Sequence, residues 1–207
     1  MVPVGEACRQ IEDRGLLTRD RADHGERIVS KVSAVLGREL PRDLVDFYRE
    51  RVASIGEFPA IAPTWNERMG WRTGDALITE LAHVQAVPIF SDGCGNLYGL
   101  DLASGGRAPA VYFFDHERGF EKPEYAAGSS LGAFLLLLAD HDRALDEGWP
   151  AKWELAIDSG LERCPRALAI WGRGDESGDL GNTAEHLARD GAEVVGECAV
   201  RGPMKYR

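Results

Sequence analysis

The sequence predicts an α+β fold in which helices pack on one face of a mostly antiparallel, twisted sheet, followed by a C-terminal extension. Two changes in hydrophobic periodicity support this prediction. Apolar residues recur at helical spacing through about the first 56 residues and again after Ser129, whereas residues 86–116 follow strand periodicity between glycine-rich turns. Helices and strands that are segregated along the chain in this way are typical of the α+β class.

Two helices are predicted at the N-terminus. Residues 6–17 have the spacing of a short amphipathic helix. Thr18 is a candidate N-cap for a longer helix over residues 19–36, which Gly37 would end. Its apolar face would consist of Ile28, Val32, Val35 and Leu36.

A third helix is predicted in "LPRDLVDFYRERVASIG", where Pro41 suits the first turn and Gly56 ends the element. Residues 58–74 are rich in Pro, Trp and Gly and show no clear period. Residues 75–83 have the pattern of another short helix, with Asp75 as its cap. The apolar stripe of the third helix would consist of Leu44, Phe47, Tyr48 and Val52.

A β-meander is predicted next, with strands at residues 86–90, 96–102 and 110–116. The last two strands are joined by the glycine-rich loop at residues 103–109. If they pair as antiparallel neighbours through that loop, an apolar face and a mixed face result. The apolar face would hold Tyr98, Leu100 and Leu102 beside Ala110, Tyr112 and Phe114, and would pack on the helices. The mixed face, partly open or covered by another segment, would hold Leu97, Gly99 and Asp101 beside Val111, Phe113 and Asp115.

The C-terminal part begins with a buried helix over residues 131–148, capped by Ser129 or Ser130. Beyond Gly148 the pattern weakens, with a predicted strand, loop, short helix and final strand. We therefore expect a domain over residues 1–149 and an extension over residues 150–207 that packs on or beside it.

Composition narrows the class of function. The formal net charge is −10, which argues against nucleic acid or an anionic membrane as the partner. The longest apolar run, "FLLLLA", is too short to span a bilayer, and no signal peptide is evident. The four cysteines are widely scattered, as expected for reduced thiols in a cytoplasm. We expect no cofactor.

The stretch "SDGCGN" has two interpretations. As turn chemistry, at least one of Gly93 and Gly95 would have a positive φ, and Asn96 would complete a structural turn. Alternatively, Asp92, Asn96, His116 and Glu117 would approach one another at one edge of the meander as a metal or catalytic site. Only one His and one Cys are available there, whereas a metal needs three or four converging ligands.

Two other motifs have plain structural interpretations. His141 has no partner at the i+4 position and is expected on a solvated helix face. The glycines of "WGRGDESGDLGN" do not have the spacing of a phosphate-binding loop, so a surface loop is expected over residues 171–182.

Several motifs together resemble the SUKH superfamily, which includes fungal cell-wall assembly regulators and bacterial immunity proteins. The resemblance covers roughly residues 20–147, within the predicted domain over residues 1–149. It departs from the family pattern at Cys94, at residues 58–72 and in the C-terminal extension. Its motif residues are Leu40, Pro41, Asp43 and Phe47; Asp92, Gly93, Gly95, Asn96, Tyr98, Asp101 and Leu102; and Val111, Tyr112, Phe113, Asp115, His116 and Glu117.

The resemblance implies an α+β domain without catalytic residues, and the small set of converging ligands leads us to expect no metal. It further implies a protein that neutralises a cognate toxin. Together with the acidic composition and the cysteine pattern, this predicts a cytoplasmic protein that occludes a basic toxin. The first alternative is a scaffold or regulatory interaction module. The second alternative is an enzyme that uses the Asp92/His116 edge. The partner would be a protein, not nucleic acid or membrane, and the oligomeric state stays open. The expected partner-binding residues are Asp92, Asp101, Phe113, Asp115, His116, Glu117 and Glu121.

Overall fold

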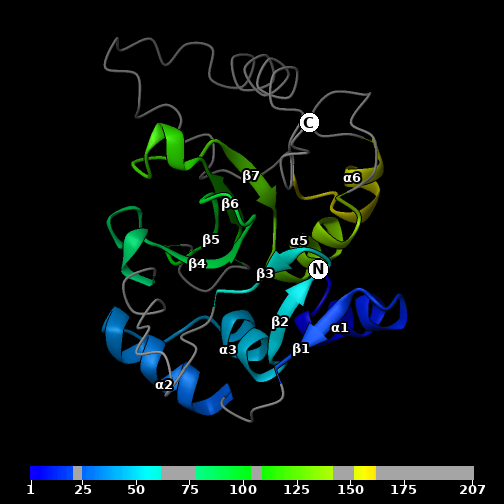
Figure 1. Cartoon of the computed structure of the whole chain (residues 1–207), viewed down its shortest axis with the longest axis horizontal. Helices are drawn as coiled ribbons and strands as arrows, with labels where there is room; N and C mark the ends of the chain where they lie inside the picture. Colours follow the sequence, from blue (N-terminus) through cyan, green and yellow to red (C-terminus); the bar gives the residue numbers. More distant parts are fainter. Residues whose placement is uncertain (21–24, 62–77, 104–108, 142–151, 162–207) are drawn as a thin grey trace.

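The computed structural model describes residues 1–20, 25–61, 78–103, 109–141 and 152–161. Within these residues the fold is α+β, as predicted, with helices and two antiparallel sheets (Figure 1). No helix in the described ranges combines the length and apolar character needed to cross a membrane. Most of the predicted C-terminal extension, including residues 171–182, lies outside the described residues.

The N-terminal half builds a small sheet with helices around it. Its strands have the order β1-β2-β3, and both pairs are antiparallel. This three-stranded sheet is a feature that the periodicity did not predict. The elements are α1 (Val4–Asp13), β1 (Leu17–Arg19), α2 (Gly25–Leu36), α3 (Arg42–Arg49), β2 (Val52–Ile55) and β3 (Phe58–Pro59).

Several predicted helix boundaries are wrong. The first helix ends at Asp13 instead of residue 17, because Leu17 begins β1, and the helix predicted over residues 131–148 ends at Ala139. Thr18 is not an N-cap, because it lies in β1 and pairs with Ser54 of β2. The third helix ends at Arg49 instead of continuing to Gly56. Pro41 is its N-cap, and Gly37 after α2 has the expected positive φ of 62°. Residues 21–24 of the predicted second helix lie outside the described residues.

The second sheet contains the predicted meander and one strand more. Its order is β4-β5-β6-β7, and each neighbouring pair is antiparallel. A bridge between Ala60 and Phe90 places the small sheet beside β4. The strands are β4 (Ala86–Ser91), β5 (Leu97–Asp101), β6 (Val111–Phe114) and β7 (Tyr125–Gly128).

The pairing of β5 with β6 differs from the expected one by one residue. Tyr98 lies opposite Phe113, and Leu100 lies opposite Val111. Directly opposed residues share a face of the sheet, so the expectation that Tyr112 shares a face with Leu100 is wrong. Both strands are buried along their whole length. Because both faces are apolar, hydrophobic alternation does not distinguish the two registers.

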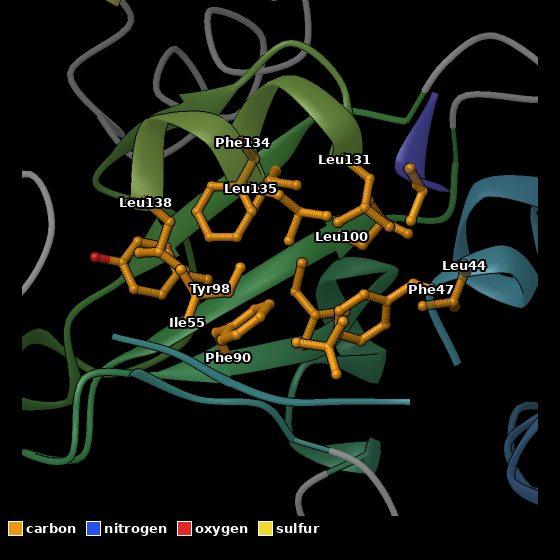
Figure 2. Packing of buried hydrophobic residues seen from close by; sticks show 14 of the residues in the cluster. Leu44, Phe47, Ile55, Phe90, Tyr98, Leu100, Leu131, Phe134, Leu135 and Leu138 are labelled. Carbon is orange, nitrogen blue, oxygen red and sulfur yellow. The ribbon is translucent and has the colours of Figure 1, made fainter. Parts of the chain in front are cut away.

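One face of this sheet packs on helices. Ser130 caps α5 (Leu131–Ala139), whose Phe134, Leu135 and Leu138 point toward the strands (Figure 2). α5 in turn packs against α1 and α3. Figure 2 shows the resulting core, in which α5 and α3 enclose Phe90, Tyr98 and Leu100. The predicted packing of helices on one face of the sheet is therefore confirmed.

The other face is covered by short segments. Leu81, which precedes η1 (Ala82–Val84), packs so closely on β5 that a Cβ at Gly99 would lie 2.6 Å from its Cδ1. Covering by another segment was one of the two expectations for the mixed face. This second cluster contains Ile61, Leu81, Ala86, Leu97, Tyr112, Phe114, Ala126, Leu137 and Leu161.

The first residues of the predicted extension pack on this body. α6 (Lys152–Ile157) contacts α5. The buried Asp158 accepts hydrogen bonds from the Ser129 backbone N–H at 2.6 Å and from the Gly160 N–H at 3.1 Å. The domain boundary at residues 149 and 150 stays a prediction.

Candidate functional site

The candidate site consists of the β4–β5 turn and the segment that follows β6, residues 92–96 and 115–118, here called the Asp92–His116 edge. Antiparallel pairing brings both segments to the same end of the sheet (Figure 1). The φ angles of Gly93 and Gly95 are 79° and 104°, so the predicted positive φ is confirmed for both. Glycine adopts this conformation without the steric cost that other residues incur.

Both oxygens of the Asp92 carboxylate accept hydrogen bonds within the turn. Its Oδ1 accepts hydrogen bonds from the backbone N–H groups of Cys94 at 2.9 Å and Asn96 at 3.2 Å. Its Oδ2 accepts from the Asn96 amide Nδ2 at 2.6 Å. Such local acceptance by Asp stabilises a tight turn. Burial raises the pKa of the Tyr98 hydroxyl, and the nearby Tyr125 and Asp92 raise it further.

Asn96 joins the two segments of the Asp92–His116 edge. Its side chain is fully buried, and its Oδ1 accepts hydrogen bonds from the His116 backbone N–H at 3.0 Å and from His116 Nδ1 at 2.8 Å. The structure therefore brings together Asp92, Asn96 and His116, as the meander predicted. Sequence reasoning expected Asn96 and His116 to approach each other at this edge, but it did not identify the hydrogen bonds that join these two residues, which lie 20 positions apart in the chain.

Asp115 shapes the segment after β6. Its carboxylate caps η2 (His116–Arg118) by accepting a hydrogen bond from the Glu117 N–H at 2.9 Å. His116 and Glu117 are exposed. The third member of η2, Arg118, pairs with Glu124 at 2.7 Å. The short turn thus presents an imidazole and a carboxylate on a backbone that Asp115 and Asn96 both hold.

The remaining predicted partner-binding residues lie elsewhere. Glu121 is exposed, and its carboxylate folds back over Gly119. Asp101 is buried at the opposite end of β5 from the Asp92 turn, where it accepts a hydrogen bond from the Ala103 N–H at 2.8 Å. Phe113 is buried and packs on Tyr125, with ring centroids 4.9 Å apart. The Asp92–His116 edge therefore does not include Asp101 or Phe113.

A second polar group lies around His141. The expectation of a solvated helix face is wrong, because the His141 ring meets Phe58 edge-on with centroids 4.7 Å apart. Its Nε2 lies 3.4 Å from Glu57, and Arg14 pairs with Asp140 at 2.7 Å beside it. Arg14, Glu57, Asp140 and His141 line a hollow of about 470 Å³.

The side chains of the Asp92–His116 edge and of the group around His141 can form hydrogen bonds and ion pairs. Within the described ranges, no three His, Cys, Asp or Glu side chains converge as ligands for a metal ion. Cys94 is partly exposed in the turn, and Cys8 is fully buried in α1. Cys164 and Cys198 lie outside the described residues.

Comparison with known proteins agrees with the arrangement of these elements. The family model described as SMI1 / KNR4 family (SUKH-1) matches residues 26–136. The match includes α3, the whole meander, the Asp92–His116 edge and the first part of α5. The search of curated proteins and the search of solved structures each found no match.

Proposed function

The chain belongs to the SMI1 / KNR4 family (SUKH-1), and on this basis we propose that it is a non-catalytic, cytoplasmic protein-binding domain of the immunity type. It neutralises a cognate, basic protein toxin by covering the surface that the toxin needs for its activity. The partner is a protein, because a net charge of −10 disfavours nucleic acid and anionic lipid.

One observation carries the proposal: the Asp92–His116 edge presents polar groups on a backbone that is held in place. Asn96 and Asp115 fix the position of η2 through hydrogen bonds, while His116 and Glu117 remain exposed. A preorganised surface loses little conformational freedom on binding, which favours affinity. Exposed carboxylates next to it favour approach by a basic partner.

The two alternative functions, a scaffold and an enzyme, predict different experimental results. A scaffold or regulatory module would bind its partner at the same edge without abolishing the partner's activity. An enzyme would use His116 at the Asp92–His116 edge as a base. Asp92 and Asn96 give that imidazole a hydrogen-bonded support, which is the specific observation in favour of the enzyme.

The test is neutralisation inside cells. The toxic domain of a secreted nuclease or deaminase encoded by the neighbouring gene would be expressed with and without this chain, and survival counted. We expect the wild-type chain to restore growth and Glu117→Lys to restore less of it. Glu39→Lys is the matched control, because Glu39 is exposed in the loop between α2 and α3 and its reversal changes the net charge equally.

The outcomes separate the three functions. Binding of the toxin without recovery of growth would favour the scaffold. Conversion of a small molecule by the purified chain, abolished in His116→Ala, would favour the enzyme. The absence of any toxin gene beside this one would contradict the immunity proposal.

A further inference from the structure

The orientation of the Asn96 amide follows from its neighbours. The atom of Asn96 that faces the His116 backbone N–H at 3.0 Å must be an acceptor, because a backbone N–H can only donate. The oxygen Oδ1 therefore faces His116. The nitrogen Nδ2 then faces the Asp92 carboxylate at 2.6 Å, where a donor is needed. Both partners require the same orientation, so the reverse amide orientation is excluded.

This orientation determines where His116 carries its proton. His116 Nδ1 lies 2.8 Å from the same Asn96 oxygen. An amide oxygen can accept a hydrogen bond but cannot donate one. The contact is therefore a hydrogen bond only if Nδ1 carries a hydrogen. In a neutral imidazole one ring nitrogen is the donor and the other the acceptor. The neutral His116 ring is therefore the Nδ1–H tautomer, with the lone pair on Nε2.

The acceptor nitrogen of His116 is accessible. The side chain is 40% exposed, and Nε2 makes no hydrogen bond within the part of the chain that the structure describes. Gly95 leaves the space in which the ring lies, since a Cβ there would be 3.1 Å from His116 Cγ. The ring is thus held on one side by Asn96 and packed over Gly95, and its Nε2 edge is free.

We propose that Asn96 is a positioning residue that holds His116 in the Nδ1–H tautomer, so that the exposed Nε2 accepts a hydrogen bond from a basic side chain of the bound protein. The neighbouring Glu117 carboxylate favours an ammonium or guanidinium donor over a neutral one. The contact with the partner deepens the proposed function and rests on it. The tautomer is a property of the chain alone.

The tautomer can be measured without a partner. Two-bond and three-bond nitrogen–proton correlation spectra of the full chain distinguish Nδ1–H from Nε2–H for each imidazole, with peaks assigned by His→Gln variants. His83 is the internal control, because its Nε2 lies 2.9 Å from the Phe120 carbonyl and must carry the hydrogen. We expect opposite patterns for His116 and His83. An Nε2–H pattern for His116 would overturn the proposal.

The role of Asn96 has its own measurement. Asn96→Ala removes the acceptor, so the His116 pattern should move toward Nε2–H while that of His83 stays unchanged. An unchanged His116 pattern in this variant, with the fold intact by circular dichroism, would overturn the assignment of Asn96. Should the variant fail to fold, acylation of the wild type by diethyl pyrocarbonate gives a second test. This reagent attacks nitrogen lone pairs, and peptide mapping should show faster modification of His116 than of His83. Equal or slower modification of His116 would contradict an accessible Nε2.

The partner contact is tested separately. Once co-expression identifies a toxin, His116→Phe should weaken its binding roughly tenfold, because an aromatic ring is kept while the Nε2 acceptor is lost. The same change removes the Nδ1–H bond to Asn96, so Asn96→Ala is measured beside it to separate the two losses. Unchanged affinity would overturn the partner contact while leaving the tautomer result intact. Failure of the immunity proposal would likewise leave the spectra unaffected.

Discussion

At the scale of single residues, the Asp92 turn shows which parts of a site local sequence can predict. The positive φ of Gly93 and Gly95 follows from the tight turn between two strands. The hydrogen bonds between His116 and Asn96 do not, because they join η2 to the β4–β5 turn and depend on the register of β5 and β6. A one-residue slip of that pairing would move His116 away from Asn96.

Cys8 illustrates how burial controls reactivity. Burial raises the pKa of its thiol from 9.0 to about 12, and the Glu50 and Glu12 carboxylates add to the shift while Arg19 opposes it. The thiolate is the reactive form, so native Cys8 should be inert at pH 8. We expect brief iodoacetamide treatment to label the partly exposed Cys94 at least about tenfold faster than Cys8. Peptide mass mapping would measure both, and equal labelling in the native protein would contradict the burial of Cys8.

The same pKa predicts a change of stability in alkali. The folded chain keeps the Cys8 proton between pH 9 and about 12, whereas the unfolded chain loses it above pH 9. The unfolded state then binds fewer protons, so the free energy of unfolding falls as pH rises through this window. Urea titrations at pH 8 and pH 10 should show a smaller loss of stability in Cys8→Ala than in the wild type. An equal loss in both proteins would mean that Cys8 does not contribute.

At the scale of elements, the errors in the predicted boundaries have a physical cause. Leu44, Phe47, Tyr48 and Val52 recur at helical spacing, which predicts one continuous helix. The chain leaves the helix at Arg51, whose φ of 54° is left-handed. Arginine carries no sequence signal for this conformation, in contrast to glycine or asparagine. The strand β2 that follows is four residues long, too short for its own period to show.

The packing of α1 against α5 leads to a prediction for Gly132. A Cβ at Gly132 would meet the Val2 backbone carbonyl well within 3.0 Å, and backbone cannot move aside cheaply. Helix propensity alone would favour Gly132→Ala by about 1 kcal/mol. The clash should outweigh this gain, because overpacking costs about 1–3 kcal/mol. We expect the melting temperature to fall by about 2 °C or more.

Gly5 in α1 is the matched control for that substitution. A Cβ there would meet only the end of the Glu50 side chain, at 3.1 Å. That carboxylate can shift, so Gly5→Ala should leave the melting temperature unchanged or raise it. Calorimetry on both variants measures the difference. An increase for Gly132→Ala of the same size as for Gly5→Ala would show that α1 and α5 are not in close contact.

At the scale of the whole molecule, the sheet has no free face within the described residues. Helices cover one face, and Leu81, Ile61 and Leu161 cover the other. The prediction that one sheet face packs on helices succeeded because β5 and β6 are almost uniformly apolar, with Asp101 as their one charged residue. The same uniformity left the register open, and with it the placement of Phe113. Binding groups are therefore to be sought at the ends of strands, where turns bring polar side chains to the surface.

The net charge of −10 bears on how fast a basic partner arrives. Exposed charges at the rim of an interface chiefly affect the association rate and its dependence on salt. Asp92 is a poor target for charge reversal, because its carboxylate holds the turn through three hydrogen bonds. Glu117 lies in the Asp92–His116 edge and Glu121 lies three residues beyond it in the sequence. Both are exposed, so reversing both tests the charge at and next to this edge without breaking the turn.

Glu117→Lys combined with Glu121→Lys should slow association with the proposed basic toxin roughly threefold to tenfold at low salt. The effect should shrink toward physiological salt, where charges are screened over about 8 Å. Surface plasmon resonance at several salt concentrations would measure the association rate. Glu39→Lys with Glu80→Lys is the control of equal charge, since both residues are exposed outside the Asp92–His116 edge. Equal slowing by both pairs would mean that only the net charge matters, whereas no slowing by either would move the docking surface away from this edge.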